Sequence, residues 1–307
     1  MEGDDVAYLE AARTVDERAH SDAATRAFRA ALGVGEGVDA EGDPVCVLEA
    51  GAGTCGLLRR LLADGALPAG EWVAVDTDER VLSAGRDLLR EEAHAAGYGV
   101  DAGGVGLRLG SPDQEAALRV RFETRDARDV ASEGTFDGVV GRSFADLLAP
   151  DDVLALARTA APDGWYHLPL TFDGETRFEP SHPADGAVVD AFHATMRNRG
   201  RAATRVAETL REAGTPPAVD ARSDWTVRGR GDGDDARDAG TSGGVVYPAD
   251  EATFLRIVLD TVVASVRDAG AVGDATLSAW ETERTEQLRR GELGYVAGNR
   301  DLFGRVP

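Results

Sequence analysis

Three glycines in the segment Gly51-Ala52-Gly53-Thr54-Cys55-Gly56 separate an apolar run, Val45 to Ala50, from a helical pattern. Glycine has no Cβ, so a loop of this kind brings its backbone and the N-terminus of the next helix close to a ligand. A second apolar run, Trp72 to Asp76, ends in a carboxylate about 20 residues further on, a position from which an acid accepts hydrogen bonds from ribose hydroxyls. These two segments predict a nucleotide-type site.

Acids at the ends of the predicted strands indicate which nucleotide binds. The glycine spacing fits the G-x-G-x-x-G pattern of dinucleotide-binding proteins, so an NAD(P)-dependent oxidoreductase is an alternative. Glu49, however, lies two residues before the first glycine, where its charge would repel a pyrophosphate and attract a cationic amino acid group. Asp126 follows a third predicted strand, 118–123, and is placed to accept the exocyclic amine of adenine. The three acids therefore favour S-adenosylmethionine.

These segments resemble the motifs of the class I S-adenosylmethionine-dependent methyltransferases, which have a Rossmann-like fold. The first motif of that family, E/D-x-G-x-G, is matched by Glu49 to Gly53, and its acid after the second strand is matched by Asp76. Its Asp-Ala pair after the third strand is matched by Asp126 and Ala127. The resemblance covers roughly Val45 to Leu170 and implies S-adenosylmethionine as cofactor. The cofactor-binding residues that it implies are Glu49, Gly51, Gly53, Asp76, Thr77, Asp126, Ala127 and Gly141.

Methyl transfer requires little of protein side chains, because the sulfonium already makes the methyl group electrophilic. Positioning of the nucleophile contributes up to ~7–11 kcal/mol, so a catalytic base is optional. Our candidate catalytic residues are Arg142, after the fourth predicted strand, and His193, in a helical pattern after the fifth. A surface ion pair for Arg142 and a structural role for His193 are the alternatives. A protein that binds S-adenosylmethionine for regulation, without turnover, is a further alternative.

The expected partner is a small-molecule methyl acceptor, and no nucleic acid. The net charge of -22 opposes phosphate binding, and Gly141 to Phe144 replaces the Asn/Asp-Pro-Pro-Tyr turn of methyltransferases that modify base amino groups. No H-E-x-x-H or C-x-x-C spacing is present, so we expect no metal. The candidate acceptor-binding residues, for each of which ordinary packing or surface exposure is the alternative, are Tyr8, Arg13, Tyr166, Phe172, Phe178 and Asn299.

Short apolar strands alternate with helical patterns, which predicts an α/β fold with a doubly wound, mostly parallel, seven-stranded sheet and helices on both faces. Residues 6–32 are expected to form one helical stretch, and residues 97–117, 171–183 and 228–244 to form loops. The predicted organisation is an N-terminal helical lid (1–44), an S-adenosylmethionine-binding core (45–172), a helical insertion that caps the acceptor (173–221) and a C-terminal completion of the sheet with two helices (222–307).

The composition indicates the environment of the protein. All 33 basic residues are Arg and face 55 acids, which together with a pI near 4.6 resembles proteins of an extreme halophile. At molar salt the Debye length is about 3 Å, so this self-repulsion is tolerated. We expect a cytoplasmic protein without a membrane partner, because no secretory segment and no apolar run of ~18 residues is present. The oligomeric state is not indicated.

Overall fold

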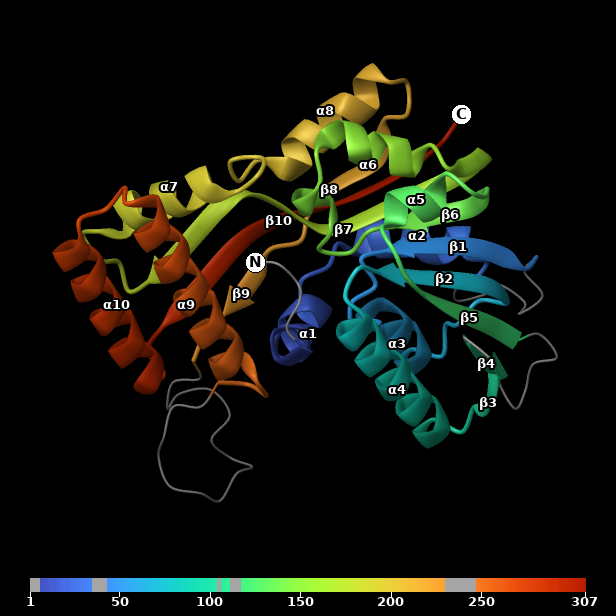
Figure 1. Cartoon of the computed structure of the whole chain (residues 1–307), viewed down its shortest axis with the longest axis horizontal. Helices are drawn as coiled ribbons and strands as arrows, with labels where there is room; N and C mark the ends of the chain where they lie inside the picture. The colour runs from blue at the N-terminus through green and yellow to red at the C-terminus, as the bar shows by residue number, and fades with distance from the viewer. Residues whose placement is uncertain (1–5, 35–42, 104–105, 111–116, 230–246) are drawn as a thin grey trace.

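The computed structural model describes residues 6–34, 43–103, 106–110, 117–229 and 247–307. These residues form a ten-stranded sheet with helices on both faces and a second lobe at one end of it (Figure 1). The loop expected at 228–244 lies almost entirely outside the described residues. None of the helices within the described ranges combines the length and apolar content needed to cross a membrane.

Five parallel strands form the centre of the sheet, in the order β5-β2-β1-β6-β7. β1 and β2 each include four consecutive buried residues, as expected for strands that are covered on both faces. The predicted α/β class with a mostly parallel central sheet is therefore correct. The bounds of these strands are β1 (Val45–Ala50), β2 (Gly70–Asp76), β5 (Ala117–Thr124), β6 (Phe136–Val140) and β7 (Ala160–Glu179).

Antiparallel strands flank this centre on both sides, so the predicted number of seven strands is wrong. A hairpin of β3 (Gly99–Gly103) and β4 (Gly106–Gly110) extends the β5 edge, where we expected a loop. Only Leu107 and Leu109 of β4 face the core, and glycine ends both strands, so the apolar pattern is too short to predict them. The strands of the opposite flank are β8 (Pro217–Arg222), β9 (Trp225–Val227) and β10 (Gly294–Arg305).

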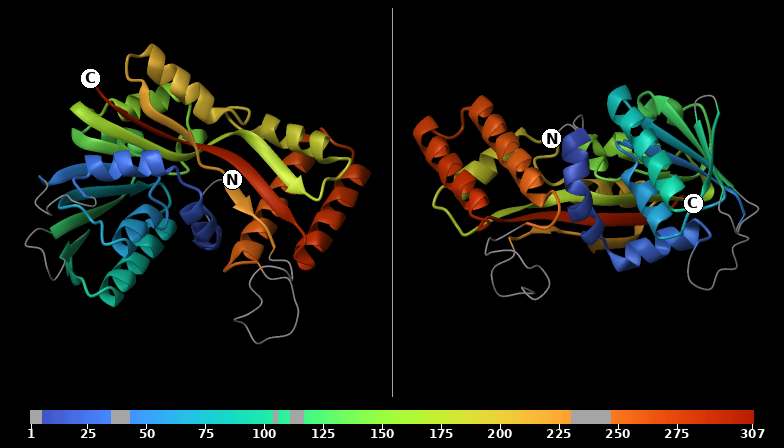
Figure 2. Two further views of the ribbon diagram at one scale, coloured as in Figure 1. Left: turned by 180° about the vertical axis from the view of Figure 1, so that it is seen from behind. Right: turned by 90° about the horizontal axis from the view of Figure 1, so that it is seen from below.

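Helices cover both faces of the parallel strands (Figures 1 and 2). Each contributes apolar residues to a cluster on its own face, so the sheet is the middle layer of three. One face carries α2 (Asp22–Ala31), α3 (Gly56–Ala63) and α4 (Glu79–Ala95). The other face carries α5 (Ala127–Ala131), the short helix η1 (Ala145–Leu147), α6 (Pro150–Ala157) and α8 (Ala202–Glu212).

The second lobe is built on the long ends of β7 and β10, which pair beyond the parallel centre (Figure 1). The expected loop at 171–183 is wrong for residues 171–179, because β7 continues to Glu179, and Phe178 pairs with Tyr295 of β10. The half-exposed residues 173–177 give that part of β7 little apolar pattern. The predicted insertion 173–221 contains α7 and α8, but it begins in β7 and ends in β8. The helices of the lobe are α7 (Asp185–Thr195), α9 (Glu251–Ala269) and α10 (Asp274–Arg289).

The N-terminal segment forms two helices where we expected one. α1 (Val6–Arg18) and α2 are separated by a short turn, and Ser21 caps α2 by accepting a hydrogen bond from the Ala24 N–H at 3.4 Å. The Ser21 N–H itself donates to the Asp301 carboxylate at 2.8 Å, which holds the turn against β10. α1 lies between the second lobe and the parallel centre of the sheet (Figure 2).

Candidate functional site

The order of the parallel strands reverses between β1 and β6. From β1 the chain continues outwards to β2 and β5, whereas from β6 it continues in the opposite direction to β7. The helices that follow these two strands, α3 and α6, lie on opposite faces of the sheet. Such a reversal opens a crevice at the carboxyl ends of the strands, which is where α/β sheets bind ligands. The predicted cofactor residues lie at this edge, at the ends of β1 and β2 or directly after β1, β2, β5 and β6.

The glycine loop after β1 has a defined backbone shape. Gly51 and Gly53 have φ angles of 68° and 54°, a region that glycine adopts without steric cost. Cys55 has a φ of 57°, although it carries a side chain, and stands directly before α3. The Ala52 N–H donates to the carbonyl oxygen of Val75 at 2.9 Å, which ties the loop to the end of β2. The backbone thus turns tightly at the point where α3 begins.

The Asp76 carboxylate joins the glycine loop to the segment after β2. One of its oxygens accepts a hydrogen bond from the Gly53 N–H at 2.9 Å, and the other accepts one from the Asp78 N–H at 3.0 Å. Each carboxylate oxygen has two acceptor positions, so Asp76 retains capacity for further donors. Its side chain is half-buried, and the neighbouring Thr77 is exposed. Asp76 therefore organises the loop and is still available to a ligand.

Glu49 is a buried carboxylate at the end of β1. Only 2% of the residue is exposed, and the Trp72 indole N–H donates to it at 2.7 Å. Burial raises the pKa of Glu49 to about 7, against the opposing effects of the Trp72 hydrogen bond and the positive charge of Arg142. A charged Glu49 therefore has one neutral donor and no ion-pair partner within the described residues.

Two apolar side chains cover the glycine loop. The Phe144 ring lies so close to Gly51 that a Cβ at this position would lie 2.3 Å from its Cδ2 atom. Leu9 of α1 lies 3.3 Å from the position of a Cβ on Gly53. Any larger residue at position 51 would clash with an aromatic ring as well as strain the backbone. The loop is thus packed against the segment after β6 and against the N-terminal helix.

Arg142 lies between α1 and the start of α3. Its guanidinium forms an ion pair with Asp16 of α1 at 3.3 Å, and both side chains are 15% exposed. Its Nη1 atom lies 3.0 Å from the position that a Cβ on Gly56 would occupy. The preceding Gly141 donates its N–H to the carbonyl oxygen of His167 in β7 at 3.0 Å. Arg142 is therefore held beside the glycine loop by α1 rather than exposed to solvent.

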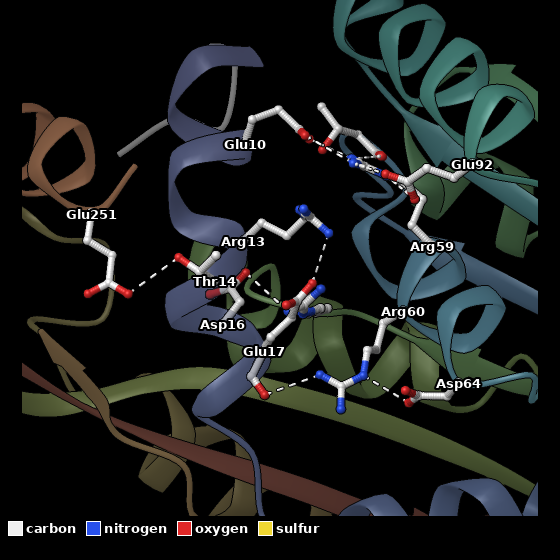
Figure 3. Close-up of polar contacts among 12 residues, drawn as sticks. Glu10, Arg13, Thr14, Asp16, Glu17, Arg59, Arg60, Asp64, Glu92 and Glu251 are labelled. Atoms are coloured by element: carbon white, nitrogen blue, oxygen red, sulfur yellow. Dashed lines mark hydrogen bonds and ion pairs between the residues drawn. The ribbon is translucent and has the colours of Figure 1, made fainter. Parts of the chain in front are cut away.

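α1 is attached to both parts of the molecule by polar contacts (Figure 3). The Arg59 guanidinium, 2% exposed, donates to Glu10 of α1 at 2.6 Å and to Glu92 of α4 at 2.7 Å. On the opposite side of α1, the Thr14 hydroxyl donates to the fully buried Glu251 of α9 at 3.4 Å. α1 thus connects the helices around the glycine loop to the second lobe.

Asp126 caps α5, the short helix after β5. Its carboxylate accepts a hydrogen bond from the Arg128 N–H at 2.9 Å and forms an ion pair with the Arg128 side chain at 2.6 Å. The hydrogen bonds from the Arg128 side chain lower the pKa of Asp126. Ala127 is buried in the core beside β1. These contacts give Asp126 a structural role at the predicted edge, and its contact with adenine stays a prediction.

Comparisons with known proteins find similar folds only at low similarity. No protein-family model matches the sequence, and no curated protein matches it. A putative sarcosine dimethylglycine methyltransferase from Galdieria sulphuraria is 12% identical over 92% of this chain and 82% of its own, with a TM-score of 0.42. A putative methyltransferase from Thermoplasma acidophilum is 14% identical over 85% and 68%, with a TM-score of 0.40. A mycolic acid cyclopropane synthase, in complex with SAH and CTAB, is 12% identical over 84% and 78%, with a TM-score of 0.39.

Two of the predicted acceptor residues lie on α1. Tyr8 is buried and stacks on Phe254 of α9, with ring centroids 6.0 Å apart. Arg13 is partly exposed and forms an ion pair with Glu17 one turn further along α1 at 3.1 Å. Both residues share the helix that covers the glycine loop, and their contact with an acceptor stays a prediction.

The predicted residues of the insertion lie in the second lobe. His193 forms a hydrogen bond to the Thr176 hydroxyl at 2.9 Å and meets the Phe172 ring edge to face at 5.5 Å. Burial lowers the pKa of His193. Phe178 is buried against Trp280, with ring centroids 5.3 Å apart. None of these contacts reaches the glycine loop, so the structure does not bring His193 and Phe178 together with Glu49 and Asp76. Their roles in turnover stay predictions.

Tyr166 and Asn299 also lie apart from the loop. The Tyr166 hydroxyl donates to the carbonyl oxygen of Thr215 at 2.8 Å on the face covered by α6 and α8. Asn299 is 3% exposed, and its N–H donates to the Asp224 carboxylate at 3.3 Å. Among the described residues, no group of three His, Cys, Asp or Glu side chains could hold a metal ion.

Four residues around the site were not predicted as members of it. Leu9, Asp16 and Phe144 lie in segments without a motif, and they reach the loop only through the packing of α1 and of the turn after β6. His167 was visible as a polar residue within an apolar strand, which was the one available sign.

Proposed function

We propose that this protein is an S-adenosylmethionine-dependent methyltransferase that acts on a small-molecule acceptor. The observation that carries the proposal is the meeting of buried Glu49, the left-handed glycines and Asp76 at the strand reversal. A dinucleotide would place its pyrophosphate beside a carboxylate at this loop, which like charges oppose. An amino acid end with an ammonium group is instead attracted by it.

The residues of the loop fit this cofactor. Asp76 has remaining acceptor capacity for two ribose hydroxyls, and Gly51 and Gly53 present their backbone without a Cβ. A buried carboxylate such as Glu49 is stabilised by a cation, and the ammonium group of the cofactor would supply one. Thr77 borders Asp76, Gly141 follows β6, and Asp126 with Ala127 would lie near the adenine.

The bound cofactor would supply an electrophilic methyl group on a sulfonium. The chain then has to bind and orient the acceptor and exclude water, which is where most of the rate enhancement of such a reaction arises. Leu9 and Phe144 cover the loop with apolar groups, and Arg142 holds α1 over it through Asp16. We assign no general base.

We further propose that the acceptor is not a nucleic acid and that the protein works at high salt. The excess of 55 acids over 33 Arg gives the net charge of -22, which repels polyanions. A salt-rich cytoplasm would screen the same charge. Residues 173–221, which we expected to cap the acceptor, begin within β7, and this role stays a prediction.

Substitution of the site acids tests the proposal. We expect Asp76→Ala to weaken the binding of S-adenosylhomocysteine by about 1.5–3 kcal/mol, the scale of hydrogen bonds to a charged group. Glu49→Gln should also weaken binding, because the ammonium loses a charged partner. The measurement is calorimetric titration in high salt, and Asp87→Ala is the control, since this acid lies 47% exposed on α4. Unchanged affinity in both site variants, with circular dichroism as in the wild type, would contradict the assignment.

A further inference from the structure

A cavity of about 80 Å³ lies between α1, α2, α3 and β7. Apolar side chains from three elements form part of its wall: Phe28 of α2, Leu57 of α3 and Leu170 of β7. Asp16 and Arg142, the ion pair that joins α1 to the loop, form another part. Arg142 therefore connects the cavity with the glycine loop, because its guanidinium also lies beside Gly56.

His167 provides an unpaired polar group in this cavity. The residue is 4% exposed, and its ring stacks on Phe28 with centroids 4.5 Å apart. Nδ1 is buried without a hydrogen-bond partner among the residues that the structure describes, whereas the ring itself forms a hydrogen bond with the backbone of Leu302. Buried polar atoms are normally paired, so an unpaired imidazole nitrogen in a cavity indicates a missing partner.

His167 also stands in register with the acid of the glycine loop. Glu49 pairs with Val140 across β1 and β6, and Val140 pairs with His167 across β6 and β7. Neighbouring strands are ~4.8 Å apart, so Glu49 and His167 are about 10 Å apart on one face of the sheet. Arg142 acts electrostatically on both of them. A molecule in the cavity would thus lie beside the proposed cofactor site.

The charged side chains around the cavity are already paired: Arg29 and Arg60 form ion pairs with Asp64, and Glu17 forms one with Arg13. Arg142 is bound by Asp16, and the Asp301 carboxylate accepts hydrogen bonds from the N–H groups of Ser21 and Leu170 at 2.8 and 2.9 Å. Burial lowers the pKa of His167 to about 3, so the imidazole is neutral and too weakly basic to act as a proton acceptor near neutral pH. It serves as a hydrogen-bonding group, and the site favours an uncharged ligand.

We propose that this cavity binds the methyl acceptor and that the acceptor is a small, uncharged, largely apolar molecule whose hydroxyl or amine is hydrogen-bonded by His167. The inference rests on the proposed function, because it takes the glycine loop as the source of the methyl group. It gives the acceptor a position under α1, in place of the second lobe where His193 and Phe178 lie.

Phenol and toluene test the proposal, because they have nearly the same shape and only phenol has a hydroxyl. Binding is measured by ligand-observed NMR titration in ~2 M KCl, a concentration at which charge repulsion is screened. We expect wild-type protein to bind phenol at least about tenfold more tightly than toluene, the usual scale for one hydrogen bond to a buried group. In His167→Phe, which keeps the ring stacked on Phe28, the ratio should fall towards one. His94→Phe on the exposed side of α4 is the control and should keep the wild-type ratio.

Equal binding of phenol and toluene by the wild type, or an unchanged ratio in His167→Phe, would overturn the proposal. Should His167→Phe fail to fold, Thr25→Trp fills the same cavity from α2, away from the glycine loop. It should abolish phenol binding, and retained phenol binding would overturn the proposal.

Titration with S-adenosylhomocysteine on the same samples separates the two proposals. If S-adenosylhomocysteine binds but phenol selectivity is absent, only the cavity assignment fails. If phenol selectivity is present but S-adenosylhomocysteine does not bind, the methyltransferase function fails, and the acceptor role with it.

Discussion

Glu49 is the residue whose charge state governs the electrostatics of the site. In the folded protein its pKa is raised by burial to about 7, from a usual value of 4.5. Between these two values the folded state keeps a proton that the unfolded state releases, so rising pH favours the unfolded state over this range. Each pH unit in the range costs about 1.4 kcal/mol of folding free energy. The wild type should therefore lose stability through Glu49 between pH 5 and 8.

Glu49→Gln removes this titration while keeping an acceptor for the Trp72 indole N–H. Between pH 5 and pH 8, we expect the free energy of unfolding of the wild type to fall by about 2 kcal/mol relative to that of the variant. Guanidinium unfolding of both proteins across this pH range measures the difference. A difference that does not change with pH would show that Glu49 titrates normally and is not buried as described.

At the same scale, the sequence was enough to predict that Glu49, the glycines and Asp76 lie at one edge of the sheet, because each is at the end of a predicted strand or directly after it. It could not place Asp16 or Phe144, since neither belongs to a motif and both reach the loop through tertiary packing. Asp126 shows the opposite limit: its position was predicted from spacing, yet its carboxylate is used to cap α5. A residue at the right strand end is thus not automatically free for a ligand.

At the scale of elements, the parallel strands were predictable because they are buried on both faces and read as continuous apolar runs. The elements that were missed, β3, β4 and β8, lie on the flanks of the parallel centre. β4 has buried residues on one side alone, and β8 has none. The extension of β7 to Glu179 was missed for the same reason. Strands of this kind depend on their pairing partners, which a single segment of sequence does not reveal.

α1 is the element that connects the site with the rest of the molecule. Its sequence predicted an amphipathic helix, and its contacts explain where the helix binds. Leu9 packs on Gly53. Glu10 binds Arg59, and Thr14 contacts Glu251 (Figure 3). A buried guanidinium such as Arg59 requires acids around it, which fixes the position of α1 relative to α3 and α4. Both the glycine loop and the cavity at His167 are therefore closed by the same helix.

At the scale of the whole molecule, the charge of -22 determines the conditions in which the two lobes are stable. Many Arg side chains form exposed ion pairs, which contribute little individually and weaken in salt. The remaining excess of acids repels, and this repulsion is removed by screening. We therefore expect the melting temperature to rise steeply between ~0.1 M and ~2 M KCl.

The salt series is followed by differential scanning calorimetry, with sorbitol at matched osmolality as the control for effects of an excluded solute. If charge screening is the cause of the stabilisation, KCl stabilises the protein far more than sorbitol does. A melting temperature that stays flat in KCl, or that rises equally in sorbitol, would contradict adaptation to high salt and would leave the proposed cofactor site unaffected.

The central claim is that the glycine loop, Glu49 and Asp76 bind S-adenosylmethionine rather than a dinucleotide. The most direct measurement is calorimetric titration of the wild-type protein in high salt with S-adenosylhomocysteine and, separately, with NADH. We expect saturable binding of one S-adenosylhomocysteine per chain and no measurable binding of NADH above the Glu49 pKa of about 7, because the ionised Glu49 attracts an ammonium group and repels a pyrophosphate. Binding of NADH without binding of S-adenosylhomocysteine would contradict the claim in favour of an oxidoreductase, and binding of neither would contradict a nucleotide site at this loop.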